Sequence, residues 1–494
     1  MSIYDGTNGP VIKVYVDSGN LGANYFVLGS STLSSTSATV TAASGNGTTV
    51  TYTASNTFTA GQTVTITGLG IASGSSLNLA AVIIATASST QFTVTNSTVG
   101  VSSGVGTAKQ GDVLHTYSPL TSLVQIPSTD VRSISIRRGR TREDQAFQPG
   151  TMTLTLDNRS GAYDPQTLNA TYSSGTYSMF SGGTNMKVTA TWSGIEYSLY
   201  AGYIEFVEVD QSLDPIVTIT CVDFFKRLAD AAPLTNFTAY TQSGSVAASI
   251  FSSFGWNYGG LYCYGSYNAY VEKPTDNPLA VLERLASGQG GRVFCGKDGS
   301  ANFQGYDYIV PAGAASLTFS DQRTSGTIEY DNIVVTPGSR YLLNSVVVTP
   351  APVWWSQYPY GSAVIQTFTN TGSSARFGLA QNSITSYNGY WIVNPDGSGT
   401  YLQYPDPTIS QYLADHFANA EYRVETLDFE VSKLDALGGT IWPNFLNAEI
   451  GTKISVARTP VYTTARTYTC LIQGMNHDIT PNSWRCNLML SPAS

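Results

Sequence analysis

The residues in this 494-residue chain that could do chemistry are a serine motif, three histidines and several pairs of carboxylates. Residues 100–104 match the G-x-S-x-G pattern of a serine nucleophile, which requires a turn from a strand into a helix. Here the motif lies in a glycine-rich stretch without charged residues, so an esterase site is not expected. His416 lies on the apolar face of a helix expected over residues 409–422, and His477 lies in a turn expected over residues 476–481. We expect packing of the first histidine and hydrogen bonding of the second to the backbone, not catalysis.

Pairs of carboxylates could act as the acid and base of a glycosidase if the fold brought them together. The candidates are Glu205 with Glu208 and Glu425 with Asp428, for which charged strand faces are the simpler explanation. The sequence contains no H-x-x-x-H or H-E-x-x-H motif and no aspartate-rich calcium loop. Its five cysteines are scattered without a C-x-x-C pair, which favours reduced thiols over disulfides or a zinc site. We therefore expect no catalytic residues, no cofactor and no metal site.

Arginines cluster in one short stretch of the chain. Five of the 24 basic residues fall within the eleven positions from Arg132 to Arg142. One interpretation is a phosphate-binding patch. Because the planar guanidinium suits bidentate pairing with carboxylates, we favour ion pairs between subunits, with Glu143, Asp144 or acidic groups of partner proteins. The residues expected at such an interface are Arg137, Arg138, Arg140 and Arg142.

Two alternating strands surround these arginines. In the first, Ile134 and Ile136 alternate with serines, and in the second, three apolar residues between 152 and 156 alternate with threonines. A period of two places the apolar set on one face of a sheet. The segment Asp157–Gly161 supplies the residues of a tight turn. The arginine cluster is therefore expected at a basic turn around Gly139, between two strands.

The composition favours β structure and an extensively contacted surface. The chain has 47 glycines, 31 tyrosines and only 12% charged residues, about half the usual share of roughly 25%. Disorder requires high charge and few aromatic residues, so the low charge indicates an ordered surface suited to a permanent assembly. The net charge of −9 argues against a dedicated nucleic-acid binder but is compatible with a protein past which DNA slides. The N-terminus shows no secretory signal, and the longest apolar run, residues 79–87, is far shorter than a membrane helix.

The pattern along the chain predicts a mainly β, multidomain fold. Residues 18–108 contain no Asp, Glu, Lys or Arg, and their short alternating strands predict a small immunoglobulin-like β-sandwich inserted into a surface loop. Further on, a helix is expected over residues 277–286, with Asn277 as its N-cap. The expected domains are an N-terminal β domain (1–35 and 109–235), the insert (36–108), an α+β middle domain (236–340) and a C-terminal β domain with one helix (341–494).

Three segments resemble one protein family. The first is the string of residues 131–165, with its two strands and its turn. The second is the middle pattern of a short helix, the Gly290–Val293 segment and an Asp298-Gly299 hairpin. The third is the C-terminus, IGTKISVARTP followed by IQGMNHDITPNSWRCNLMLSPAS. In this order they resemble the baseplate hub, or minor tail, proteins of long-tailed bacteriophages.

The resemblance implies an architecture, an assembly and a set of partners. The N-terminal and C-terminal domains would be tube-like β-barrels that alternate in a homotrimer and form a pseudo-sixfold ring continuing the tail tube. The hub would contact the distal tail protein, the tape-measure protein and other minor tail or receptor-binding proteins. DNA would pass through it at ejection without specific binding. The protein would be a non-enzymatic, structural component of the virion tail tip, made in the cytoplasm of the bacterial host.

Two alternatives remain open. One is the hexameric distal tail protein of the same particle, which is usually shorter and lacks the helical middle region. The other is a receptor-binding adhesin, which would use the uncharged surface of the insert and the 31 tyrosines of the chain to bind a glycan of the host surface. A secreted hydrolase is disfavoured, because the sequence shows neither a signal nor a catalytic cluster.

Overall fold

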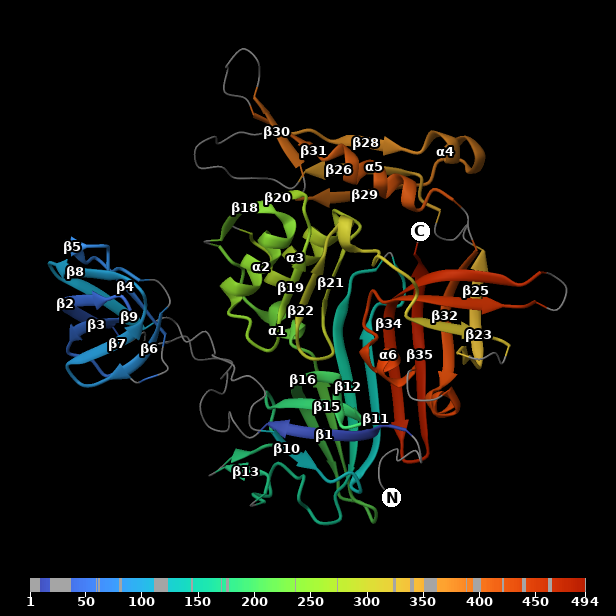
Figure 1. Ribbon diagram of the computed structural model, residues 1–494, viewed down its shortest axis with the longest axis horizontal. Helices are drawn as coiled ribbons and strands as arrows, with labels where there is room; N and C mark the ends of the chain where they lie inside the picture. The colour runs from blue at the N-terminus through green and yellow to red at the C-terminus, as the bar shows by residue number, and fades with distance from the viewer. Residues whose placement is uncertain are drawn as a thin grey trace. The chain divides into compact units, whose positions relative to one another are not determined.

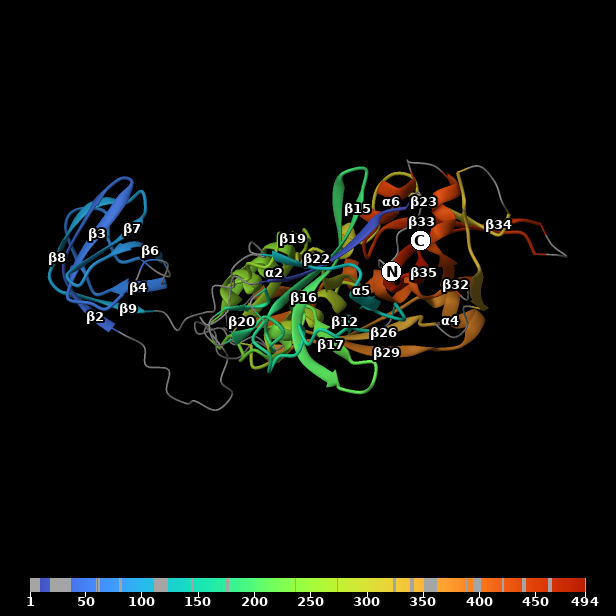
Figure 2. The same ribbon diagram turned by 90° about the horizontal axis from the view of Figure 1, so that it is seen from below.

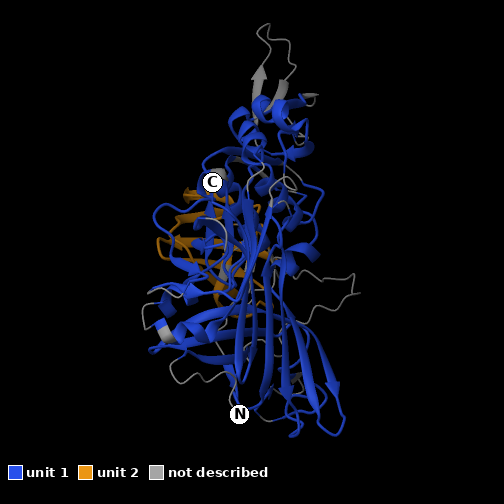
Figure 3. Ribbon diagram, turned by 90° about the vertical axis from the view of Figure 1, so that its right-hand side faces the viewer, with its two compact units in different colours: residues 1–23, 117–494 blue, residues 24–116 orange. Residues whose placement is uncertain are grey.

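The computed structural model shows a mainly β chain in two compact units (Figure 3). One unit comprises residues 1–23 and 117–494, and the other comprises residues 24–116. None of the helices in the described part of the chain is long and apolar enough to cross a membrane. The described residues are 9–17, 37–58, 60, 63–79, 82–110, 123–143, 145–169, 171–174, 177–235, 237–272, 274–322, 326–337, 342–350, 362–387, 389–393, 401–419, 422–437, 441–460 and 464–493.

The smaller unit is an eight-stranded antiparallel sheet (Figure 2). Its strands pair in the order β3-β7-β6-β4-β9-β2-β8-β5, and because β2 also pairs with β3, six of them close on themselves. The rings of Tyr52 and Phe92 stack 5.0 Å apart in its core, and the Tyr52 hydroxyl donates to the Leu77 carbonyl at 2.9 Å. The β structure expected in this uncharged segment is confirmed. The strands are β2 (Ser37–Asn46), β3 (Thr49–Ala54), β4 (Thr63–Thr67), β5 (Gly70–Gly74), β6 (Val82–Ala87), β7 (Gln91–Thr95), β8 (Val99–Ser103) and β9 (Gly106–Gln110).

The larger unit is built on a sheet of 14 strands, which come from residues between 11 and 222 and from residues between 317 and 492 (Figure 1). The main order is β10-β1-β15-β16-β17-β12-β11-β34-β33-β23-β24, and β35, β32 and β25 continue from the other side of β34. The N-terminal strands are β1 (Val11–Asp17), β10 (Leu123–Ile126), β11 (Val131–Gly139), β12 (Gln148–Asp157), β15 (Asn185–Trp192), β16 (Ile195–Asp210) and β17 (Ile216–Val222). The others are β23 (Leu317–Ser320), β24 (Ile328–Glu329), β25 (Asn332–Pro337), β32 (Tyr422–Glu430), β33 (Lys453–Arg458), β34 (Arg466–Thr480) and β35 (Ser483–Pro492). A separate short pair is β13 (Ser173–Ser174) with β14 (Tyr177–Ser178).

One hydrophobic core lies under both groups of strands. Met152, Leu154 and Leu156 of β12 are fully buried in it, so the face expected from their alternation is confirmed. Trp442 of helix α6 (Ile441–Asn447), which follows the 3-10 segment Val431–Leu437, lies 5.7 Å from Trp192 of β15 and 6.1 Å from Trp484 of β35, measured between ring centroids. Burial of such a large apolar side chain contributes roughly 1.5–3 kcal/mol. The first and last parts of the chain therefore stabilise each other.

A helical region follows the N-terminal strands. The helix expected over residues 277–286 is α3, where the Asn277 side chain accepts a hydrogen bond from the Ala280 amide at 2.9 Å and Pro278 is the first helical residue. The expected hairpin is β21 with β22, and its turn residue Gly299 has a φ of +85°. The elements are α1 (Phe225–Asp230), β18 (Thr238–Gln242), α2 (Ser243–Phe254), β19 (Leu261–Tyr264), β20 (Asn268–Glu272), α3 (Pro278–Ser287), β21 (Arg292–Cys295), β22 (Ala301–Gln304) and the 3-10 turn Tyr306–Tyr308.

The described residues between 345 and 416 form two small three-stranded sheets and two helices. The helix expected over residues 409–422 is shorter and begins earlier: it is α5 (Pro407–His416), capped by Asp406, which accepts from the Thr408 and Ile409 amides. It ends there because Tyr422 begins β32, which pairs with β25. The elements are β26 (Ser345–Pro350), β27 (Ser362–Ala363), β28 (Gln366–Thr369), α4 (Thr371–Phe377), β29 (Gln381–Ser386), β30 (Gly389–Val393), β31 (Tyr401–Pro405) and α5.

Strand pairing also shows that part of the segment expected as the middle domain joins the large sheet. Strands β23, β24 and β25 fall within residues 236–340, but they pair with the C-terminal strands or with each other. The parallel pairing of β23 with β33, with Leu317 opposite Ile454, joins residues far apart in sequence, so no local pattern reveals it. Of the expected N-terminal segment 1–35, the structure describes residues 9–17, which include β1.

Candidate functional site

The first and last thirds of the chain meet along one strand pair, β11 with β34, which we call the seam (Figure 1). Six residue pairs are in antiparallel register, from Ile134 opposite Ile479 to Gly139 opposite Gly474. On the far side of β11 lies β12, and on the far side of β34 lies β35. Two long hairpins from opposite ends of the chain therefore lie side by side in one sheet.

Two glycines let the strands approach closely at the end of the seam. Gly139 has a φ of +93°, and a Cβ atom there would lie 2.3 Å from the Gln473 carbonyl oxygen and 2.4 Å from the Gly474 Cα. The register of β34 with β35 shifts between Ile472 and Gly474, and the Arg140 amide donates to the Gln473 carbonyl at 3.0 Å. Because of its φ and this close contact, position 139 requires glycine.

Arg137 crosses the seam at the surface. Its Nη2 atom donates to both carboxylate oxygens of Asp478, at 2.8 and 2.9 Å, and the Ser135 hydroxyl donates to the same carboxylate at 2.8 Å. The side chains of Arg137 and Asp478 are 44% and 53% exposed. An exposed ion pair of this kind contributes about 0–1 kcal/mol.

Arg138 points to the opposite face and is buried, with 5% exposure. Its Nη2 atom donates to Glu449 Oε1 at 2.9 Å and to the Cys295 carbonyl at 2.8 Å. Burial opposes the charged form, but the charge of Glu449 and the hydrogen bond to it raise the pKa of Arg138. Glu449 also accepts from the Lys297 amide at 2.9 Å and the Ile450 amide at 2.8 Å. Arg138 therefore connects the seam to the β21–β22 hairpin.

Arg140 lies in the loop that follows β11. Its Nε atom donates to the Gln473 side chain and its Nη1 atom to the Gln145 carbonyl, both at 2.9 Å. The guanidinium carbon lies 4.5 Å from the centroid of the Phe147 ring, a cation–π contact. This arginine therefore fixes its own loop and attaches the loop to β34.

The arginines of the cluster thus form ion pairs and hydrogen bonds within one chain. Arg137, Arg138 and Arg140 each have partners in that chain, in the C-terminal strands or the middle region. Arg142 is half-buried in the same loop, and Asp144, one of its expected partners, lies outside the described residues. Contacts of these four arginines with a second subunit stay a prediction.

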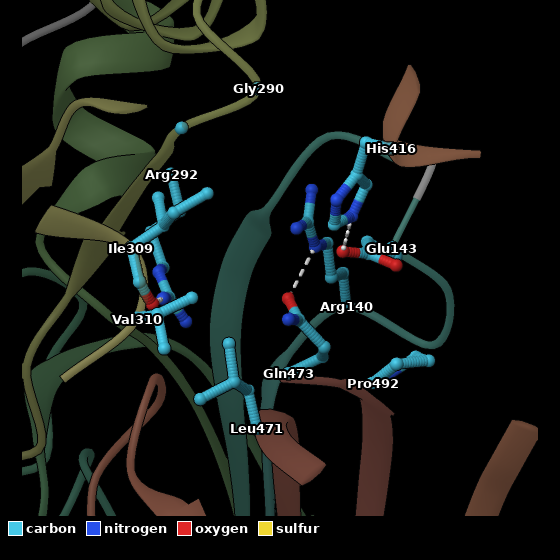
Figure 4. Close-up of a pocket in the computed structure, with 11 residues that line it drawn as sticks. Arg140, Glu143, Gly290, Arg292, Ile309, Val310, His416, Leu471, Gln473 and Pro492 are labelled. Atoms are coloured by element: carbon cyan, nitrogen blue, oxygen red, sulfur yellow. Dashed lines mark hydrogen bonds and ion pairs between the residues drawn. The ribbon is translucent and has the colours of Figure 1, made fainter. Parts of the chain in front are cut away.

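Glu143 joins the same loop to α5 through His416 (Figure 4), and to β32 through Arg423. Its Oε1 atom lies 2.9 Å from His416 Nε2, and its Oε2 atom accepts from Arg423 at 3.0 Å. Burial tends to raise the pKa of Glu143, but the hydrogen bond with His416 and the charges of Arg140 and Arg423 outweigh it and lower that pKa. His416, expected to be packed, is the last residue of α5, is largely buried and has this hydrogen-bond partner.

A small cavity of about 10 Å³ lies at this junction (Figure 4). Such a volume holds one water-sized species. Its walls come from four parts of the chain: the loop after β11, the β21 region, α5 and the C-terminal strands. The lining residues include Arg140, Glu143, Arg292, Ile309, His416 and Gln473.

The serine motif and the carboxylate pairs have ordinary structural roles. Ser102 lies in β8, where its hydroxyl accepts from the Ala43 amide at 2.7 Å, so the motif is on a strand rather than at a strand-to-helix turn. Glu205 and Glu208 are exposed on β16. Glu425 accepts from the Thr336 hydroxyl at 2.7 Å, a contact across the β25–β32 pair.

The prediction for His477 is wrong. It lies in β34 rather than in a turn, it is 4% exposed, and its Nδ1 atom accepts from the Trp484 indole at 3.2 Å. Burial lowers the pKa of His477 to about 3, so the ring is neutral. The strand continues to Thr480 because it pairs with both β11 and β35. All five cysteines are free thiols, as expected.

Sequence reasoning missed Glu449, Arg423 and Arg292. The sequence contains one signal for Arg292: it begins the otherwise apolar strand Arg292–Cys295, and a buried charge needs a partner. No local pattern distinguishes Glu449 or Arg423 from solvent-facing charges.

No protein-family model matches the chain, and no curated protein matches it. Solved structures similar to it include three tail proteins. A tail protein from Neisseria meningitidis is 10% identical, with a TM-score of 0.47 over 74% of this chain and 93% of that one. The 43 kDa tail protein of prophage MuSo2 from Shewanella oneidensis is 11% identical, with a TM-score of 0.44 over 75% and 96%. The prophage tail protein gp18 from Listeria monocytogenes is 11% identical, with a TM-score of 0.39 over 74% and 91%.

Proposed function

We propose that this chain is a structural protein of a bacteriophage tail tip, a trimeric baseplate hub that continues the tail tube. The observation that carries the proposal is the seam, at which strands from the first and last thirds of the chain form adjacent parts of one sheet over one core. The same two thirds contain two of the three segments that resemble hub proteins. Each chain would then supply two neighbouring wall segments of a six-part ring.

The free edges of the sheet support association of several copies. Strands β10, β24 and β25 each have one neighbour among the described strands, so each lies at an edge of the described sheet. Exposed edges favour pairing with another chain, and a closed symmetric ring removes them. We propose that these edges lie at or near the contacts between copies.

The charge of the chain suits a conduit for DNA. A net charge of −9 per chain gives 3 × −9 = −27 for three copies. Sequence-independent affinity for DNA comes from basic groups that neutralise phosphates, so an acidic ring would not retain the passing duplex. The hub would hold the end of the tape-measure protein, adjoin the distal tail protein and carry other minor tail or receptor-binding proteins. This role works by assembly and requires no catalysis.

The experiment is the mass of the purified oligomer, measured by native mass spectrometry. Three copies of the 52.6 kDa chain give about 158 kDa, the result expected for the hub. Six copies would identify the distal tail protein instead. A single 52.6 kDa chain at micromolar concentration would overturn both assignments.

A receptor-binding role for the insert is a second candidate, favoured by its exposed edge. Ile71 of β5, Val99 and Val101 of β8, and the adjacent Val105 are 47–62% exposed, in a segment without charged residues. Exposed apolar surface of this kind marks binding sites. Deletion of residues 36–108 from the phage separates the roles. Intact tails that no longer adsorb would support the adhesin and a glycan ligand, whereas failed tail assembly would support a purely architectural role.

A further inference from the structure

A second cavity, which we call the cleft, lies where the helical region meets the large sheet. Its volume is about 340 Å³, within the roughly 300–1,000 Å³ typical of small-molecule binding sites. Its walls come from the start of β16, from β19, from the β21–β22 hairpin, and from α6 with the residues that follow it. The cleft therefore has room for a ligand much larger than a water molecule.

A row of exposed tyrosine rings extends from the cleft along β19. Tyr262 belongs to the cleft wall, and Tyr264 lies on the same face of the strand, because side chains two residues apart point to the same side. Cys263, between them, packs against the core of the helical region. Tyr308 stacks on Tyr264 with 5.4 Å between the ring centroids. The three tyrosines are 45–48% exposed, so their rings are accessible to a ligand.

The rest of the cleft wall is largely polar. Asn302 is paired with Tyr262 in the β19–β22 register, and the amide of Asn447 also belongs to the wall. The carboxylates of Glu196 and Asp298 line the cleft, and both residues are exposed. Asp298 accepts from the Ser300 amide at 3.0 Å, which holds its carboxylate at the hairpin turn. The carboxylates accept hydrogen bonds, and the side-chain amides both accept and donate them.

The charged groups in the walls give the cleft a negative charge. They are the carboxylates Glu196, Asp298 and Glu449 and the ammonium of Lys297, which sum to −3 + 1 = −2. The Lys297 ammonium donates to two backbone carbonyls at and just after the end of α6. An anionic ligand is therefore disfavoured, and so are the phosphates of a nucleic acid.

The combination of exposed rings and exposed carboxylates selects among neutral partners. The centre of a protein interface is depleted in charged residues, and a protein surface that covered Glu196 and Asp298 would remove their hydration. A neutral sugar offers hydroxyl groups that donate to both carboxylates in charge-assisted hydrogen bonds. Its C–H face also packs on the electron-rich face of an aromatic ring.

We propose that the cleft and the tyrosine row bind a neutral oligosaccharide. One pyranose ring would be hydrogen-bonded in the cleft beside Tyr262, and further rings would lie along Tyr264 and Tyr308. The site belongs to the larger unit, so it is separate from the exposed edge of the insert. The inference does not depend on the proposed function.

The test titrates the full-length chain with three neutral hexasaccharides, chitohexaose, cellohexaose and maltohexaose, and follows binding by saturation-transfer difference NMR. We expect at least one of them to bind with a dissociation constant of about 1 mM or lower. A hyaluronan hexasaccharide, which carries carboxylates on alternate sugars, should bind at least about tenfold more weakly. Absence of binding by all three neutral sugars at about 10 mM, or equally tight binding of hyaluronan, would overturn the proposal.

Variants of one tyrosine locate the bound sugar. Tyr262→Ala removes the ring in the cleft wall and should weaken binding about tenfold, whereas Tyr262→Phe keeps the ring and should retain most of the affinity. Tyr422→Ala is the matched control: it removes a tyrosine of β32 that is 59% exposed, and it should leave the affinity unchanged. Sugar binding that Tyr262→Ala leaves intact would place the sugar elsewhere and overturn the proposal. If no sugar binds and Tyr262→Ala lowers the mass of the oligomer, the tyrosine row is instead a contact between copies, which also overturns it.

Discussion

Replacing Arg138 by methionine would remove a buried cation that joins the seam to the β21–β22 hairpin. The substitution leaves the Cys295 carbonyl without this donor and the Glu449 carboxylate without its cation. Breaking a buried ion pair from one side costs about 3–5 kcal/mol. Glu449 is 24% exposed and keeps two backbone amide donors, so we expect the lower end of that range, about 3 kcal/mol.

Arg137→Met is a matched control for this variant. It makes the same substitution at the next residue of the same strand, but removes an ion pair whose members are 44% and 53% exposed. We expect a loss of less than about 1 kcal/mol. The difference between the two variants, about 2 kcal/mol or more, therefore measures the effect of burial and not of strand propensity or of net charge.

Urea unfolding followed by tryptophan fluorescence provides the assay, because Trp442 and Trp484 are buried in the core that the seam covers. The midpoint for Arg138→Met should lie clearly below that for Arg137→Met. Equal midpoints would refute the reasoning, since burial would then have no measurable effect. A double-mutant cycle with Glu449→Gln should give a coupling energy of about 0.5–3 kcal/mol, and additivity of the two changes would place the stabilisation elsewhere.

Two further predictions concern the close strand contact and the loop carboxylate. Gly139→Ala should destabilise the chain by more than about 1 kcal/mol. Gly161→Ala is the control: Gly161 has a φ of +69°, but no atom lies within 4 Å of where its Cβ would be, so this change should cost only the backbone strain. Equal urea midpoints for the two variants would contradict the close contact at Gly139. The lowered pKa of Glu143 means that its stabilisation is present above the ordinary value of 4.5 and is lost as the pH falls through the lower folded value. Thermal unfolding at a series of pH values should show this loss in the unmodified chain and a smaller one in Glu143→Gln, so an unchanged profile would assign the acid sensitivity to another group.

Local patterns predicted the strands around the arginine cluster and the capped helix. Alternation alone placed Leu154 and Leu156 on a buried face, since a strand has only two faces and one of them must meet the core. The Asn277 cap was predictable because both the acceptor and the amide it satisfies lie within four residues. The mainly β, multidomain class followed from the same kind of local information.

Pairing between distant segments could not be predicted in this way. His477 was assigned to a turn because its neighbours Asn476 and Pro481 favour turns, yet two flanking strands hold it in an extended conformation. The helix expected to reach residue 422 ends at His416 because Tyr422 pairs with Pro337 in β25. In each case pairing with a neighbouring strand overrides the local preference.

In the candidate site too, local features could be predicted from the sequence, whereas contacts between distant segments could not. The arginines were expected at an interface, but the identity of their partners depends on which strand lies next to β11, and Asp478 is about 340 residues away. Arg292 and Glu449 can be recognised as site residues only from the fold. Arg292 carries a buried guanidinium, and Glu449 pairs with the buried guanidinium of Arg138. The sequence therefore identified arginines that form contacts in the site, but not the residues with which they pair.

The two ion pairs of the seam together specify its register. Arg138 continues the buried face formed by Ile134 and Ile136, while Arg137 faces solvent and reaches Asp478. A slip of the seam by one residue would bring the opposite face of β11 towards the core, so Arg137 would be buried without Glu449 and Arg138 would lose its partner. Because an unpaired buried charge is costly, the slipped arrangement is excluded. The register in turn fixes how the first and last thirds of the chain are placed in one sheet.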